Sequence, residues 1–147
     1  MASIAALQPE PAPIVACSIC RDVQKFDMLI EDMEALLGET WGDLTFDDAV
    51  LFLTQPDADA LRFLVMAIDQ ADEPDLPIIV DVLQMAVEKD IPVILIAEDV
   101  SPVILHRLLK HGAEEFVPYP LPEGALGDAL ARMERAKAAA ARGAQEG

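Results

Sequence analysis

Asp69 is the side chain in this sequence whose position most clearly suggests a chemical role. It directly follows residues 61–68, an apolar run interrupted only by Arg62, which is typical of a central strand in a parallel sheet. Open α/β sheets bind ligands at the carboxyl ends of their strands, so a reactive or ligand-binding carboxylate is expected at this place. A carboxylate there can also serve only as the cap of the following helix. On the residues alone, both interpretations of Asp69 stay open.

Two pairs of residues could carry other chemistry. Cys17 and Cys20 form a C-x-x-C pattern, which can be a redox pair near a strand–helix unit. Cys17 falls inside the apolar run 14–19, whereas a reactive thiol needs exposure, so we expect two reduced structural cysteines. His106 and His111 are five residues apart, which does not place them on one helix face, and no second cysteine pair completes a zinc site. We therefore predict no metal site and no cofactor.

Apolar runs and helical patterns alternate along the chain. The predicted strands are residues 14–19, 44–46, 61–68, 92–97 and 116–117. The predicted helices start at Asp22, Asp47, Leu76, Ser101-Pro102 and Ala125, with Gly38 and Gly112 as stops and Lys137 as the last residue of the final helix. Such alternation predicts an α/β fold with a doubly wound, five-stranded parallel sheet between two layers of helices.

The two ends of the chain differ from this pattern. Residues 1–13 contain three prolines and little periodicity, so we expect a flexible leader. Residues 136–147 are rich in alanine, carry two glycines and have no apolar stripe. We expect them to form a C-terminal tail, either a frayed helix end or a linker, after one domain that spans residues 14–135.

Charge and hydropathy limit the possible partners. The formal charge of −17 over 147 residues argues against a nucleic-acid surface and against an anionic membrane face, because both need clustered Lys and Arg. No apolar run approaches the roughly 20 residues that a membrane span requires. The N-terminus also lacks the basic start of a signal peptide. We expect a cytoplasmic protein with no membrane insertion.

The basic residues are concentrated in the last third of the chain. Four of them lie on the two final predicted helices and form our candidate interaction face, namely Arg107, Lys110, Arg132 and Arg135. Carboxylates follow closely in the sequence, at Glu114, Glu115, Glu123 and Asp128. A second copy could pair these cations with its own carboxylates, which predicts a weak homodimer. A simple mixed surface is the alternative.

Residues 91–97, 101–110 and 112–120 resemble the last third of a CheY-like response-regulator receiver domain. The resemblance covers roughly residues 14–135 and implies a flavodoxin/CheY-like sheet in the order 2-1-3-4-5. In that family an aspartate after the third strand accepts a phosphoryl group, a Thr or Ser ends the fourth strand, and a Lys–Pro pair follows the fifth. The matching positions here hold Asp69, Ala97 and Tyr119-Pro120.

The phosphoryl chemistry of the family is therefore degenerate in this chain. Of the two acids that normally hold Mg²⁺ after the first strand, at most Asp22 survives, as a possible residual acid pocket, and Arg21 places a positive charge beside it. The missing Lys removes a charge-assisted contact to phosphoryl oxygens, and Ala97 offers no hydroxyl. The resemblance implies an inactive phosphoacceptor position at Asp69 and no enzymatic activity. The alternative is a true phosphoacceptor response regulator of a two-component system that uses Asp69.

Tyr119 replaces the expected lysine and is flanked by two prolines. As at the matching receiver position, the Tyr119–Pro120 bond can be cis. The ring either fills the emptied acidic pocket as a structural plug or projects as an interface anchor.

Residues 20–27, 94–98 and 112–121 are also similar to the N-terminal atypical receiver domain of the TadZ/CpaE family of Flp-type pilus assembly proteins. In that family a ParA/MinD-like ATPase domain follows, and the protein helps to place the pilus machinery at a cell pole. The present sequence contains no phosphate loop of that ATPase. The resemblance implies a non-catalytic pseudo-receiver domain that contacts other pilus assembly proteins or a fused ATPase domain. A small flavodoxin-like enzyme or redox protein is a third alternative. It is disfavoured because no glycine-rich loop follows the first strand and because few aromatic residues are present to stack on a flavin.

Overall fold

The computed structural model describes residues 13–146, so the expected leader at residues 1–13 lies almost wholly outside the described residues. The strands are β1 (Ala16–Ile19), β2 (Trp41–Leu44), β3 (Phe63–Asp69), β4 (Val93–Glu98) and β5 (Glu115–Pro118). The α-helices are α2 (Asp27–Leu37), α3 (Phe46–Phe52), α4 (Leu76–Glu88), α5 (Pro102–His111) and α6 (Ala125–Glu146). Two 3₁₀ helices are η1 (Pro56–Ala60) and η2 (Gln70–Asp75).

The five strands form one parallel sheet in the order β2-β1-β3-β4-β5, which confirms the predicted fold and strand order. All seven residues of β3 are buried, as expected for the central strand of a sheet covered on both faces. The register pairs Asp69 with Glu98 and Ala97 with Pro118, so the carboxyl ends of β3, β4 and β5 lie at one edge of the sheet.

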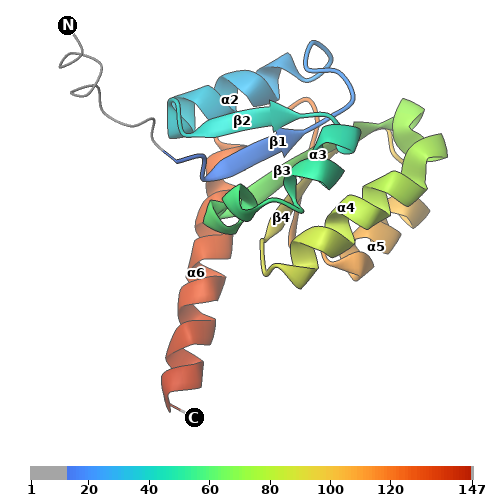
Figure 1. The fold of residues 1–147 in the computed structure, drawn as a ribbon. Helices are drawn as coiled ribbons and strands as arrows, with labels where there is room; N and C mark the ends of the chain where they lie inside the picture. Colours follow the sequence, from blue (N-terminus) through green and yellow to red (C-terminus); the bar gives the residue numbers. More distant parts are fainter. Residues whose placement is uncertain (1–12, 147) are drawn as a thin grey trace, which may run out of the picture.

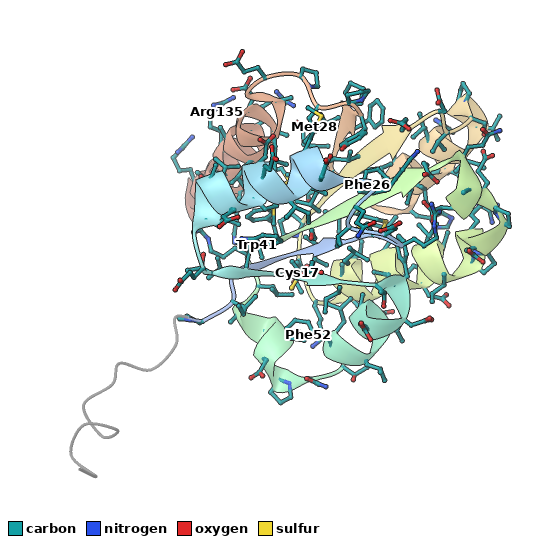
Figure 2. All side chains as sticks on the ribbon, turned by 90° about the horizontal axis from the view of Figure 1, so that it is seen from above. Cys17, Phe26, Met28, Trp41, Phe52 and Arg135 are labelled. Carbon is teal, nitrogen blue, oxygen red and sulfur yellow. The ribbon has the colours of Figure 1, made fainter. Side chains whose placement is uncertain are left out.

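Helices cover both faces of this sheet, each over its own hydrophobic core. Because strand side chains alternate, Cys17 and Ile19 face the core beneath α3, α4 and α5, whereas Ala16 faces the core beneath α2 and α6. Figure 1 shows α3, α4 and α5 grouped on one side of the strands. In Figure 2, seen from above, α2 and α6 lie across the sheet from α3 and α4.

Three of the predicted element starts were wrong. The edge strand is β2, not residues 44–46, and Thr45 rather than Asp47 caps α3, since the Thr45 side chain accepts a hydrogen bond from the Asp48 amide. β2 is half exposed and contains Gly42 and Asp43, so it lacks the apolar run that marks a buried strand. Asp22 does not cap α2: it accepts from the Gln24 amide in a preceding turn, and the helix begins at Asp27.

Both ends of α5 match the sequence signals. Ser101 caps α5 by accepting from the Ile104 amide, with Pro102 as the first helical residue. Gly112 ends α5 with φ 131°, and a Cβ there would lie 2.4 Å from Val87, so only glycine fits. The final helix does not stop at Lys137 but continues to Glu146, and Figure 1 shows it projecting beyond the sheet. None of the helices within residues 13–146 is long and apolar enough to cross a membrane.

The two cysteines lie in different cores. Cys17 packs in the core beneath α3, α4 and α5, whereas Cys20 packs in the core beneath α2 and α6. Both thiols are free and buried, and burial raises the pKa of each to about 11. This placement on opposite faces of the sheet supports structural cysteines rather than a redox pair.

We therefore expect both thiols to resist alkylation in the native protein. At pH 8 a thiol with a pKa near 11 is about one thousandth thiolate, against roughly a quarter for an ordinary cysteine. Iodoacetamide labelling followed by mass spectrometry should modify neither Cys17 nor Cys20 in native buffer and both in urea. Rapid native labelling of either residue, or a native disulfide between them, would contradict this placement.

Candidate functional site

Asp69 ends β3 and caps the η2 helix that follows. Its Oδ1 accepts a hydrogen bond of 2.9 Å from the Ala71 amide, while its own amide donates to Asp72 Oδ2 at 2.8 Å. This reciprocal arrangement is a capping box. The carboxylate of Asp69 accepts from a free backbone N–H in the first turn of the helix, and the carboxylate of Asp72 accepts from the backbone N–H of Asp69. Both side chains are consequently buried, Asp69 with 6% of its surface exposed and Asp72 with 2%.

Arg21 neutralises these two buried carboxylates. It follows β1, which lies next to β3 in the sheet, so its side chain reaches the end of β3 directly. Its two terminal nitrogens donate to the two oxygens of Asp69, each at 3.3 Å, and Nη1 also donates to Asp72 Oδ1 at 2.9 Å. The planar guanidinium fork matches carboxylate geometry in a way that a lysine cannot.

Lys25 extends this arrangement to the neighbouring strand. Its ammonium lies 3.7 Å from Asp69 Oδ2 and 3.3 Å from Oε1 of Glu98, the last residue of β4. We call Arg21, Lys25, Asp69, Asp72 and Glu98 together the Arg21 cluster. The segment between β1 and α2 thus supplies two cations to acids at the ends of β3 and β4.

The two aspartates respond oppositely to this environment. Burial opposes ionisation of Asp69, but the hydrogen bonds and charge of Arg21, with the Ala71 amide and Lys25, hold its pKa below the ordinary value. Burial raises the pKa of Asp72 above the ordinary value, although the Asp69 amide and Arg21 act in the other direction. Glu98 and Asp69 raise the pKa of Lys25, with Glu98 the larger cause. Asp69 is therefore a firmly ionised carboxylate at neutral pH.

The structure brings together some predicted site residues and separates others. Ala97 is buried one residue before Glu98 and brings no hydroxyl to this edge of the sheet. Asp22 is exposed and bonds to the Gln24 amide, outside the Arg21 cluster. Sequence reasoning missed the roles of Lys25 and Asp72. The spacing of Asp69 and Asp72, three residues apart at a helix start, is a capping-box signal that could have found the second of them.

Tyr119 packs at the start of α2 and not against Asp69. Its ring meets Phe26 edge to face, with ring centres 5.0 Å apart. Its hydroxyl accepts from the Met28 amide at 3.3 Å and lies 3.4 Å from Asp27 Oδ1, to which it donates. The N-terminus of α2 has no side-chain cap of its own, so Tyr119 supplies one from the position directly after β5. The bond from Tyr119 to Pro120 is cis, as predicted.

The residues of the Arg21 cluster do not fit the Mg²⁺ ion that receiver folds commonly hold. Mg²⁺ needs several oxygen ligands in near-octahedral geometry, whereas the Asp69 and Asp72 oxygens already bond to Arg21 and to backbone amides. A dication beside the guanidinium would also be repelled. Within residues 13–146, no three His, Cys, Asp or Glu side chains are grouped so that they could hold a metal ion.

The four basic residues of the predicted interaction face are divided between two places. Arg107 lines a groove between α4 and α5, whereas Arg132 of α6 is hydrogen-bonded to Glu115 of β5. Lys110 and Arg135 are exposed and form no ion pair with any residue of the described chain. The four residues therefore do not share one local environment. The homodimer through this basic face stays a prediction.

No family model matches this sequence, and no curated protein matches it. Solved structures do. A response regulator receiver protein from Pseudoalteromonas atlantica superposes with a TM-score of 0.60 at 15% identity, covering 84% of this chain and 98% of that one. The chain has the CheY-like receiver fold.

Two further similar structures are assigned to pilus assembly. A pilus assembly-related protein from Burkholderia pseudomallei gives a TM-score of 0.58 at 16% identity, over 85% of this chain and 92% of that chain. A pilus assembly protein (CpaE) from Burkholderia thailandensis gives a TM-score of 0.59 at 17% identity, over 81% and 96%. Identities this low establish a shared fold, and Asp69 occupies the end of its third strand.

Removal of the guanidinium should destabilise the protein because it leaves two buried carboxylates without their main partner. We expect Arg21→Ala to lower the free energy of unfolding by about 2 kcal/mol, less than a fully buried pair would lose because Arg21 is partly exposed. Urea unfolding measures this change. Arg62→Ala is the matched control, since the Arg62–Glu134 pair is exposed and should contribute less than about 0.5 kcal/mol. Equal losses in the two variants would contradict the role given to Arg21.

The lowered pKa of Asp69 gives its contribution to stability a definite pH dependence. Its ion pairs stabilise the fold fully above the unfolded-state pKa, about 4, and lose this effect as pH falls through the lower folded-state pKa. The difference in unfolding free energy between wild type and Asp69→Asn should therefore shrink as the pH falls below about 4. Asp22→Asn is the control and should show little difference at any pH. A constant difference for Asp69→Asn would contradict the ion-pair account.

Proposed function

We propose that this chain is a non-catalytic pseudo-receiver domain that acts by protein–protein contact and not by phosphoryl transfer. The single observation that carries the proposal is the bidentate bonding of Arg21 to Asp69, with Asp72 as the second acceptor. In a phosphoacceptor the aspartate oxygen must be free to attack phosphorus, and a metal ion must neutralise the crowded oxygens. Here the guanidinium of Arg21 neutralises the Asp69 oxygens instead.

Several further features support an inactive site. Asp69 Oδ1 is bonded both by Arg21 and by the Ala71 amide, and Oδ2 by Arg21 with Lys25 nearby. The position that would carry a switching hydroxyl is Ala97, and Tyr119 bonds to the start of α2 instead of serving Asp69. Each group lost would have contributed up to a few kcal/mol to the transition state of phosphoryl transfer.

The alternative function is a phosphoacceptor receiver in two-component signalling. One observation favours it: Asp69 is ionised at the end of β3, with two cations nearby that would attract an anionic donor. This arrangement would require Arg21 to leave Asp69 before attack, because it bonds to both oxygens. The energetic cost of exposing two buried carboxylates makes this the weaker proposal.

The biological setting that we propose is pilus assembly. The support is the fold shared with two structures assigned to pilus assembly, together with the sequence resemblance to the receiver domains of TadZ/CpaE proteins. The domain would work in the cytoplasm, at a cell pole, and bind other pilus assembly proteins or an ATPase domain in the same protein. It would also self-associate weakly, and the net charge of −17 favours contacts that use its few cations.

Treatment with acetyl phosphate tests the chemistry directly. We expect intact-mass spectrometry to show no added phosphoryl group on the protein, with or without Mg²⁺, because Arg21 blocks Asp69. A receiver domain that accepts phosphoryl groups serves as the positive control under the same conditions. A phosphorylated species that disappears in Asp69→Asn would overturn the proposal in favour of the phosphoacceptor alternative.

A further inference from the structure

A groove of about 480 Å³ lies between α4 and α5. Its apolar lining comes from Leu76, Pro77 and Val80 at the start of α4, and its basic lining comes from Arg107 and His111 of α5. Arg107 and His111 are one helical turn apart, so both face the same side of α5. The groove therefore combines an apolar surface with a basic wall in a protein that is otherwise strongly acidic.

The basic wall is not neutralised within the molecule. Arg107 forms no ion pair with any residue between 13 and 146, even though Asp81 also lines the groove. On the side of α5 that carries Arg107, one turn earlier, Val103 has 77% of its surface exposed. An unpaired arginine next to exposed apolar side chains has the composition of a protein contact.

A chemically complementary set of exposed side chains lies on α3. Leu51 is 64% exposed, and Asp47 and Asp48 stand one turn before it on the same side of the helix. The opposite side of α3 is buried through Phe46 and Ala49. This apolar side chain flanked by two carboxylates is the complement of an apolar groove flanked by Arg107 and His111. Leu51 with its two aspartates is called the α3 knob below.

The α3 knob and the α4–α5 groove lie on the same side of the sheet. The helices α3, α4 and α5 share one core and are grouped together in Figure 1. The α3 knob points away from that core, as the exposure of Leu51 requires. Two copies can therefore face each other through these helices. Each copy would then place its α3 knob in the groove of the other, so that the contact occurs twice, as a two-fold axis requires.

We propose that the protein forms a two-fold dimer in which the α3 knob of each copy enters the α4–α5 groove of the other. Leu51 packs on Leu76, Pro77 and Val80, while Asp47 and Asp48 face Arg107 as an ion pair and His111 as a hydrogen-bond donor. The occupant is a second copy because this chain itself carries the complementary knob with matching charge and helical spacing. The contact differs from the predicted face around Arg132, and it goes beyond the proposed function because it does not depend on the chemistry of Asp69.

Sedimentation velocity over a concentration series tests the contact. The wild type should approach twice the chain mass of 15.9 kDa as concentration rises, and the dimer should weaken at high salt because Asp47 and Asp48 pair with Arg107. Leu51→Ser and Arg107→Glu should each raise the dissociation constant at least about tenfold. Arg132→Glu, whose side chain bonds to Glu115, is the matched control and should leave dimerisation unchanged.

A charge exchange makes the test specific. Asp47→Lys combined with Asp48→Lys should abolish the homodimer, as should Arg107→Glu. Mixing these two variants should restore a dimer, because one contact then has the native pair and the other has lysines facing Glu at position 107. Circular dichroism checks that every variant is folded, which is expected because the substituted side chains are exposed.

The outcomes separate the possibilities. A monomer at all concentrations, or a dimer indifferent to Leu51→Ser and Arg107→Glu, would overturn the proposal. A dimer lost in Arg132→Glu but kept in Arg107→Glu would place the interface on the α5–β5–α6 side instead. Assemblies that grow beyond two copies would show that the knob and groove join in an open chain without two-fold closure.

Discussion

The bonding of Arg21 to Asp69 and Asp72 is the interaction on which this edge of the molecule depends. Two carboxylates with 6% and 2% exposure lie three residues apart, and such a pair is strongly unfavourable without a cation. Arg21 supplies that cation with three hydrogen bonds to the two groups. Arg21 follows β1, and Asp69 ends the central strand β3. The same bonds therefore also hold the segment after β1 against the centre of the sheet. The same hydrogen bonds therefore neutralise the two carboxylates and position the segment that follows β1.

The residues that depart from the receiver pattern act as a set of structural ties. Arg21 and Lys25 attach the segment before α2 to the ends of β3 and β4. Tyr119 attaches the first turn of α2 to the region after β5 through the Met28 amide. Positions that would hold a metal ion or move on phosphorylation in a switching domain are thus occupied by groups bonded to one another. Arg21, Lys25 and Tyr119 thus fix the geometry of this loop through bonds to distant elements.

The sequence predicted those features that depend on local pattern and missed those that depend on distant contacts. The continuous apolar runs of β1, β3 and β4 predicted a parallel sheet. Strands that are buried on both faces need no alternation of apolar and polar residues. The predicted start of α2 was wrong because the cap of this helix is not a neighbouring residue. The Met28 amide donates to the hydroxyl of Tyr119, which is 91 residues away in the sequence. Asp69 was found from its place after a strand, whereas Asp72 and Lys25 became evident only once Arg21, 51 residues before Asp72, was positioned. The basic residues were grouped by helix, yet the rotation of α5 turns Arg107 toward α4 and away from Arg132.

The Arg21 cluster and the α4–α5 groove are linked through η2. Asp69 and Asp72 fix the first turn of η2, and that 3₁₀ helix leads without a break into α4. The first residues of α4, Leu76 and Pro77, line the groove, so their position follows from where η2 is held. In a receiver that switches, a change at the aspartate can move the surfaces that partners contact. Here the cation bonded to Asp69 is Arg21, which is part of the chain itself. Under the proposed pseudo-receiver function, the binding of a partner in the groove would be set by concentration and charge screening and not by a conformational switch at Asp69.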